Sequence, residues 1–462
     1  MTNVQDKSGT DEKATNAKRV VPPGPTRVHA APPVPSRPIT AERYISEEWM
    51  QREFDVMWSK AWLFACLESD LGIPGQYVVF NLGRESILVT RNDDGEVVAF
   101  YNVCQHRGAR LMVNDRSWVR NFVCPYHGWT YDHGGKLVVV PDAERFNPPV
   151  DCAERSLKAV RVEVWAGLVF VNMDPDAVTL REFLGGVAEI VDPYRVQDMV
   201  FMTDKTVQLD CNWKAVFDNF GELYHVEHIH PQHQLLFDCP TARLDLFANG
   251  HTGVVIDGHI VNTRLPIPET PNFYLEHQLK VYGVDPSTYE GRVLDIRKDV
   301  QRLRRDAGPR LGFDYSRLSD ERLSDIEQYN LFPNTMLTLQ PESALIMRAR
   351  PHPTDPNKCF WDQFTFRMAP DPEVAQRAGV AYEPHPSLLF EQNERPEHDE
   401  FTQDDIIAGH KTMTITIDQD VHLIRDIQKG MHSRGFDTAK LCQDEDRIQH
   451  YHDWLNYFMG VR

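Results

Sequence analysis

The sequence lacks several features that would place it in a common non-enzymatic class. No run of about 18 apolar residues occurs, and the first residues lack the basic-then-apolar order of a signal peptide, so we expect a cytoplasmic protein. Positive charge is scarce: 49 Lys and Arg stand against 68 Asp and Glu, giving a net charge of −19. Such a surface repels phosphate backbones and anionic lipids, so neither nucleic acid nor membrane is an expected partner.

Cysteine is also sparse, with eight residues in 462. This number is too small for a disulfide scaffold in a chain of this length. In a reducing compartment, Cys and His residues at close spacing are typical of metal sites or catalytic sites. The places where Cys and His occur together are therefore the first candidates for function.

The composition along the chain predicts three segments. Residues 1–40 are polar and then proline-rich, which is typical of a flexible arm. An amphipathic helix from Ser46 and a series of short β-branched runs with turn signals predict a small all-β domain over residues 41–175. Residues 176–462 form the second domain. Its predicted strands cover 201–209, 254–263, 335–350 and 359–368, with helices around 292–305 and near the C-terminus, so the class is α+β with an antiparallel sheet covered by helices.

The first constellation of metal-binding residues lies in the all-β segment. It consists of two pairs on turns, Cys104-Gln105-His106 and Cys124-Pro125-Tyr126-His127. Three interpretations compete: a structural zinc ion, a [2Fe–2S] cluster with Cys on one iron and His on the other, and coincidence. A zinc finger would carry its second pair on a helix, whereas a glycine follows each pair here inside a β-rich segment. This context favours the cluster.

These two segments resemble the motif of the Rieske non-haem iron oxygenases. The resemblance implies that Cys104, His106, Cys124 and His127 bind one [2Fe–2S] cluster. Rieske proteins of respiratory chains have an additional Cys in each loop, which forms a disulfide, and this chain has none at those positions. The resemblance therefore points to the oxygenase branch, for which we expect a cluster of lower reduction potential.

A second constellation, in residues 219–233, has four His and two Glu. Two imidazoles and one carboxylate on one face of an iron are the ligand set of non-haem Fe(II) oxygenases. Glu222-x2-His225-x4-His230 matches the acidic-x2-His-x4-His pattern of the family. The resemblance implies that His225 and His230 bind iron, whereas His228 and His233 are supporting residues. It also implies that Glu222 bridges a cluster histidine of one subunit to an iron histidine of its neighbour.

The third iron ligand is expected far downstream in the chain. Residues 417–422 resemble the C-terminal acidic segment of the family, in which Asp420 fits the ligand position best and Asp418 is the alternative. The family usually has Asp at the bridging position. The Glu found here as Glu222 is the minority form, known among members that attack quaternary amines.

The resemblance implies an oxygenase component with an all-β Rieske domain and a helix-grip (START-like) catalytic domain. Its expected cofactors are one [2Fe–2S] cluster and one mononuclear Fe(II), with electrons that come from NAD(P)H through a reductase and in some systems a ferredoxin. A homotrimer, or a trimer with a small β subunit, is expected. The first expected reaction is hydroxylation, in the form of cis-dihydroxylation, of a hydrophobic aromatic or polycyclic compound. The alternative is a monooxygenase that hydroxylates or oxidatively demethylates its substrate, such as an amine or quaternary ammonium compound.

Overall fold

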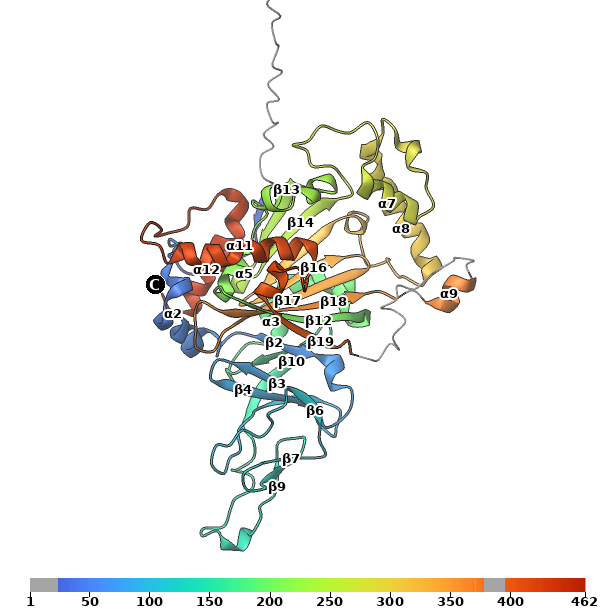
Figure 1. Cartoon of the computed structure of the whole chain (residues 1–462). Coiled ribbons are helices and arrows are strands. Elements are labelled where there is room, and N and C mark those ends of the chain that lie inside the picture. Colours follow the sequence, from blue (N-terminus) through green and yellow to red (C-terminus); the bar gives the residue numbers. More distant parts are fainter. Residues whose placement is uncertain (1–23, 370, 378–394, 462) are drawn as a thin grey trace, which may run out of the picture.

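The computed structural model describes residues 24–369, 371–377 and 395–461, which form two β-rich parts (Figure 1). The smaller part lies at the lower end of the view in Figure 1, and the larger part, with most of the helices, lies above it. This arrangement confirms the α+β class that the sequence predicts, with an all-β part followed by a sheet covered by helices.

The smaller part contains two antiparallel sheets. The strand order of the larger of these two sheets is β2-β11-β10-β5-β4-β3-β6. Its strands are β2 (Leu63–Leu67), β3 (Gln76–Leu82), β4 (Glu85–Arg91), β5 (Val97–Tyr101), β6 (Arg116–Trp118), β10 (Ala159–Trp165) and β11 (Leu168–Asn172). The other sheet consists of β7 (Phe122–Val123), β8 (Thr130–Tyr131) and β9 (Leu137–Val139). The two Cys/His pairs lie in the turns next to β5 and β7.

A nine-stranded sheet forms the centre of the larger part, in the order β1-β13-β14-β15-β16-β17-β18-β12-β19. It is antiparallel except at its two edges, where β1 pairs in parallel with β13 and β19 with β12. The strands are β1 (Thr26–Val28), β12 (Val200–Leu209), β13 (Phe237–Leu246), β14 (Thr252–Gly258), β15 (Ile326–Leu331), β16 (Thr335–Gln340), β17 (Ser343–Pro351), β18 (Cys359–Arg367) and β19 (His398–Thr402).

Helices cover one face of the large sheet. Figure 1 shows α11 (Ile415–Met431) and α12 (Asp446–Phe458) across the strands, near α5 (Trp213–Asn219). Further helices are α1 (Glu42–Ile45), α2 (Glu47–Arg52), α3 (Leu180–Leu184), α4 (Gly186–Val191), α6 (Val226–Ile229), α7 (Phe273–Val281), α8 (Ile296–Leu311), α9 (Pro372–Arg377) and α10 (Gln403–Ile407). In the described part of the chain, no helix is long and apolar enough to cross a membrane.

A continuous core joins the two parts. The ring centroids of Phe64 on β2 and Phe364 on β18 lie 5.6 Å apart. Between them, the buried Arg348 donates hydrogen bonds to the carbonyl oxygens of Phe64 and Ala65, at 2.6 and 2.9 Å, and to Asp362 at 2.8 Å. A buried guanidinium is tolerated only when it is paired and hydrogen-bonded. Arg348 therefore ties the smaller part firmly to the large sheet.

Three features differ from the sequence-based expectation. Within the predicted flexible arm, residues 24–40 lie against the body, because Arg27 and His29 contact the buried carboxylate of Asp245, each at 2.6 Å, and β1 pairs with β13 as the edge strand of the large sheet. Residues 1–23 of the arm lie outside the described residues. The predicted strand 335–350 is a hairpin of β16 and β17, and the predicted strand 254–263 ends at Gly258 in β14.

Candidate functional site

The two Cys/His loops of the smaller part have the same backbone structure. In the first, the amide of Cys104 donates to the carbonyl of Ala109 at 2.8 Å, and Gly108 donates back to Cys104 at 3.0 Å. The second repeats this pattern, with Cys124 to Trp129 at 2.8 Å and Gly128 to Cys124 at 3.0 Å. Each glycine has a positive φ, +76° and +71°, which a residue with a side chain rarely adopts. Two equivalent loops therefore present one Cys and one His each.

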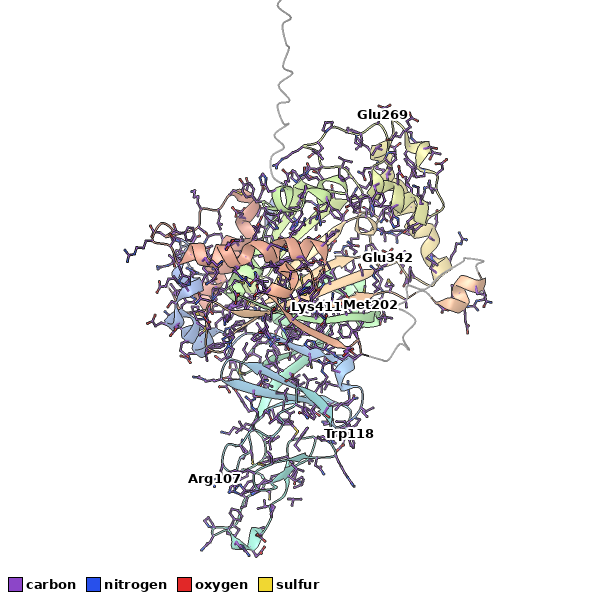
Figure 2. The ribbon with its side chains drawn as sticks, viewed as in Figure 1. Arg107, Trp118, Met202, Glu269, Glu342 and Lys411 are labelled. Carbon is purple, nitrogen blue, oxygen red and sulfur yellow. The ribbon has the colours of Figure 1, made fainter. Side chains whose placement is uncertain are left out.

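The side chains of the loops divide into a sulfur end and an imidazole end. Cys104 and Cys124 are 1% and 3% exposed and lie side by side. The burial of Cys104, and in addition the neighbouring thiol of Cys124, raise the pKa of Cys104. The rings of His106 and His127 lie 4.6 Å apart, nearer the surface. The hydroxyl of Tyr131 lies 3.4 Å from Sγ of Cys104. Figure 2 labels Arg107, which follows His106, on this lower part of the molecule.

The donor set of these loops fits a two-iron cluster. A pair of thiols next to a pair of imidazoles matches the Rieske arrangement, in which Cys binds one iron and His the other. Nδ1 of His106 is buried and has no hydrogen-bond partner within the described structure, as expected of an atom that binds a metal. One face of the His106 ring stacks on Trp129 at 4.8 Å, which fixes its orientation. The loops are thus preformed for a [2Fe–2S] group.

The second constellation lies on the helix-covered side of the large sheet. His225 precedes the one-turn helix α6, and His230 follows it. Histidines five residues apart do not share a face of a continuous helix. The helix ends at Ile229, because the residue before Pro231 is disfavoured in the helical region, and His230 adopts φ −120° and ψ 59°. This break turns the ring of His230 toward that of His225, with centroids 5.2 Å apart.

Asp420 reaches the same place from α11. The buried positions of this helix are Ile417, Asp420, Val421, Ile424 and Gln428, a spacing that places them on its inward face. A carboxylate in an otherwise mostly apolar stripe is costly to bury unless it is paired or binds a metal. Asp420 is 5% exposed, and its Oδ1 has no hydrogen-bond partner among the described residues. This oxygen therefore has the character of a metal ligand.

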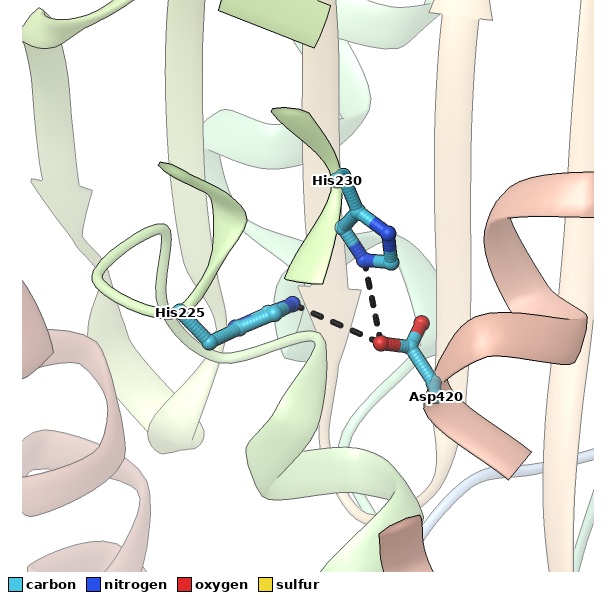
Figure 3. A group of neighbouring side chains, drawn as sticks. All are labelled: His225, His230 and Asp420. Carbon is cyan, nitrogen blue, oxygen red and sulfur yellow. Dashed lines mark ion pairs between the residues drawn. The ribbon is translucent and has the colours of Figure 1, made fainter. Parts of the chain in front are cut away.

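Figure 3 shows His225, His230 and Asp420 facing one another. Oδ1 of Asp420 lies 3.0 Å from Nε2 of His230 and 3.6 Å from Nε2 of His225. The three ligand atoms lie within 4.8 Å of one another, and this is the single such group of three or more His, Cys, Asp or Glu in the part of the chain that the structure describes. Two nitrogens and one carboxylate oxygen on one side of a point match the ligand set of non-haem Fe(II).

Charged side chains surround the histidine pair. Oε1 of Glu222 contacts Nδ1 of His225, and its Oε2 accepts the backbone N–H of His225 at 3.1 Å. Burial lowers the pKa of His225, but the hydrogen bond and charge of Glu222 and the charge of Asp420 outweigh it and raise the pKa overall. The fully buried Arg447 has Nη1 and Nη2 without partners among the described residues. Burial lowers the pKa of Arg447 to about 10, and the negative charge of Glu222 partly offsets this shift. Sequence reasoning missed this buried cation.

The structure places the remaining predicted residues outside the trio. Asp418 lies near the start of α11, whose N-cap is Thr414, and accepts the amide of Met413 at 2.9 Å. His228 is exposed, and His233 contacts Thr416 Oγ1 at 2.9 Å. Burial, with the nearby His230, lowers the pKa of His233 to about 4, so it stays neutral. Sequence reasoning also missed Gln419, which contacts Nδ1 of His230 at 2.7 Å.

Two family models match the chain. The Rieske [2Fe-2S] domain model matches residues 61–160, and the ring hydroxylating alpha subunit (catalytic domain) model matches residues 196–461. The second match covers more than half of the sequence. The chain therefore belongs to the family of ring hydroxylating alpha subunits, the large subunits of Rieske oxygenases, whose cofactors are a [2Fe–2S] cluster and a mononuclear iron.

Particular relatives include both dioxygenases and monooxygenases. The chain is 30% identical over 189 residues to the glycine betaine monooxygenase oxygenase subunit of Pseudomonas aeruginosa, covering 41% of this chain and 44% of that one. It is 34% identical over 191 residues to the naphthalene 1,2-dioxygenase large oxygenase component of Pseudomonas aeruginosa, covering 40% and 42%. These alignments span less than half of each relative.

The fold is shared with a solved structure of a quaternary ammonium Rieske monooxygenase, which is described in terms of carnitine oxidation and inter-subunit electron transfer. The TM-score is 0.63 at 18% identity, and the match covers 93% of this chain and all of that one. At this identity the likeness establishes the fold and leaves the substrate to other evidence.

Proposed function

We propose that the chain is the oxygenase component of a Rieske system that uses O₂ to hydroxylate a small organic substrate. The observation that carries this proposal is the convergence of His225, His230 and Asp420 within 4.8 Å in a chain that also carries the paired Cys/His loops. When bound, the cluster supplies electrons and the iron supplies the place where O₂ is reduced.

The residues have distinct roles in this proposal. Cys104 and Cys124 bind the inner iron of the cluster, and His106 and His127 bind the outer iron. His225, His230 and Asp420 hold the mononuclear iron through Nε2, Nε2 and a carboxylate oxygen. Because these three ligands occupy one side, they leave the opposite side open to substrate and O₂.

Glu222 links the iron site to the surface that receives the cluster. It accepts a hydrogen bond from Nδ1–H of His225 and so keeps the lone pair of Nε2 free to bind iron. Glu222 itself is 9% exposed, and Tyr224, two residues further along the chain, is 57% exposed. We infer that the cluster loops of a neighbouring subunit contact this surface in a head-to-tail trimer, with Glu222 as the bridge for electrons. A cytoplasmic protein served by a reductase, with or without a ferredoxin or a small β subunit, fits this arrangement.

Two substrate classes are candidates. Cis-dihydroxylation of a hydrophobic aromatic or polycyclic compound adds both atoms of O₂ together with two electrons and two protons. Monooxygenation of an amine or quaternary ammonium compound inserts one oxygen atom into a C–H bond and releases the other as water, which also consumes two electrons and two protons. Glu222 favours the second class, whereas the relatives support both, since they include glycine betaine and carnitine monooxygenases as well as naphthalene and 2-halobenzoate dioxygenases.

One experiment decides between these reactions. The purified protein is reduced under anaerobic conditions, given peroxide in place of its redox partners, and offered pooled aromatic, steroid-like and quaternary ammonium compounds. A product that gains two oxygens and two hydrogens establishes dihydroxylation. A product that gains one oxygen, or loses a methyl group as formaldehyde, establishes monooxygenation. Absence of any oxidised product from all pools, with both metal centres full, would contradict the proposed function.

A further inference from the structure

Gln419 lies directly before Asp420 on α11, and its side-chain oxygen is fixed from two sides. Oε1 lies 2.7 Å from Nδ1 of His230 and accepts a hydrogen bond from Nε2 of Gln232 at 2.8 Å. Both are short, well-formed contacts for a neutral acceptor. The amide oxygen of Gln419 is thus held against the edge of the His230 ring that faces away from Asp420.

The chemistry of imidazole gives this contact a consequence. A neutral histidine binds a metal through the nitrogen that has a lone pair, while its other nitrogen carries the proton. An acceptor at Nδ1 draws the proton to that atom and leaves the lone pair on Nε2. In His230, Nε2 is the atom that lies 3.0 Å from Oδ1 of Asp420. Gln419 therefore selects the tautomer and ring orientation that a metal at this site requires.

We propose that Gln419 is a positioning residue for His230, an inference that rests on the proposed iron site. One helix then supplies both a ligand, Asp420, and the support of a second ligand. The support is also unlike that of His225, whose Nδ1 contacts the carboxylate of Glu222. A carboxylate pulls the imidazole proton more strongly than an amide oxygen and makes the ring a stronger donor. The two histidines therefore differ in donor strength although both belong to one ligand set.

The test measures iron binding rather than turnover. Protein with an intact cluster and an emptied mononuclear site is titrated with Fe(II) without oxygen, and the site is then probed by the electron paramagnetic resonance spectrum of its nitric oxide adduct. Gln419→Leu removes the acceptor, and Gln419→Asn retains an amide that is one methylene too short to reach Nδ1. For both variants we expect Fe(II) affinity to fall about 10- to 100-fold, with an altered spectrum.

Three further variants separate positioning from a general structural role. Gln419→Glu keeps an acceptor in place, so its affinity stays within a few-fold of wild type, while the stronger donor shifts the midpoint potential of the iron downward. Gln232→Leu removes only the second contact to Oε1, and we expect a change of a few-fold at most. Lys429→Ala, on the same helix and paired with Asp426 alone, leaves binding and spectrum unchanged.

The outcomes distinguish the inference from the function on which it rests. If wild type binds Fe(II) and both Gln419→Leu and Gln419→Asn bind it equally well with the same spectrum, the inference is overturned and the proposed function stands. If wild type itself binds no iron beside an intact cluster, the proposed function falls and the inference falls with it.

Discussion

Oδ1 of Asp420 lies 3.0 Å from Nε2 of His230, although the two residues come from a helix and a loop far apart in the sequence. Neither element alone forms a metal site. The break of α6 before Pro231 turns His230 inward, and the inward face of α11 carries Asp420 to it. The site therefore forms only when α11 packs on the large sheet.

The first prediction concerns the carboxylate ligand. Asp420→Ala removes the sole oxygen donor of the trio, so we expect Fe(II) affinity at the mononuclear site to fall by roughly 100-fold or more. This loss exceeds the about 10- to 100-fold loss that is usual when a residue that only hydrogen-bonds to a metal ligand is removed. The cluster, which is bound by other loops, should remain complete. Metal analysis and the visible absorption of the cluster measure both effects.

Asp418→Asn is the matched control for Asp420→Ala. Asp418 accepts the amide of Met413 near the start of α11 and does not enter the trio. This variant should retain iron and nearly all of its stability, because the Asn side chain keeps an oxygen that can accept the Met413 amide. Full iron in Asp420→Ala together with iron loss in Asp418→Asn would reverse the assignment.

The second prediction concerns the bridge. Glu222→Gln keeps the shape of the side chain but removes the charge that holds the Nδ1 proton of His225. We expect both metal centres to persist, with iron affinity weakened at most about 10- to 100-fold, while transfer of electrons from cluster to iron slows sharply. Rapid mixing of reduced protein with O₂ and substrate measures cluster oxidation. Glu227→Gln, whose carboxylate pairs with Arg264, is the control; wild-type rates in Glu222→Gln would exclude the bridging role.

The third prediction concerns the reduction potential of the cluster. The hydroxyl of Tyr131 lies 3.4 Å from Sγ of Cys104 and accepts the amide of Gln105 at 3.0 Å. Against a thiolate ligand the hydroxyl donates, which stabilises the more negative, reduced cluster. Tyr131→Phe should therefore lower the potential by on the order of 40 mV, equivalent to about 1 kcal/mol for one electron. A redox titration that gave an unchanged or higher potential would contradict this role.

The fourth prediction concerns stability at mildly acid pH. His251 is fully buried, its Nε2 donates to the carbonyl of Phe183 at 2.8 Å, and its Nδ1 accepts the amide of Phe332 at 2.9 Å. Burial lowers its pKa to about 4, so the folded state holds a neutral ring while the unfolded state binds a proton below its ordinary value near 6.5. The free energy of unfolding should fall as the pH falls from about 6.5 to 4, by about 3 kcal/mol.

Urea unfolding at several pH values tests this sign. His251→Gln should be less stable than wild type at pH 7, because a buried hydrogen-bonding ring is replaced, and its stability should decline less steeply toward acid pH. Parallel pH profiles for the two proteins would show that another group causes the acid sensitivity.

Much of this architecture could be predicted from particular residues. The two Cys/His pairs predict the cluster loops, because only a few metal groups use one thiolate and one imidazole from each of two turns. The family pattern around Glu222 led to the prediction of His225 and His230 as iron ligands, and the structure brings their rings to 5.2 Å from each other. Asp420 was chosen over Asp418 by resemblance, and the structure brings it, rather than Asp418, to the histidines.

Other features carry no local signal. Gln419 is a neutral amide on a helix, and its role depends on a loop that lies close only in the fold. Arg27 and His29 pair with the carboxylate of Asp245, which is buried in the fold. The composition of the arm does not reveal that such a partner exists. The hairpin of β16 and β17 is different: its turn lacks the Asn-Gly or Asp-Gly pair typical of hairpins, but Pro341 is a local break signal that the prediction of a single strand passed over.

Analysis of iron, zinc and acid-labile sulfide in the anaerobically purified wild-type chain tests the central claim most directly. The account predicts about three irons for every two sulfides in each chain, and about two irons for every two sulfides in Asp420→Ala. It also predicts a red-brown protein whose cluster signal is the same in both. Zinc in the Cys/His loops without sulfide, or an iron content that Asp420→Ala leaves unchanged, would contradict it.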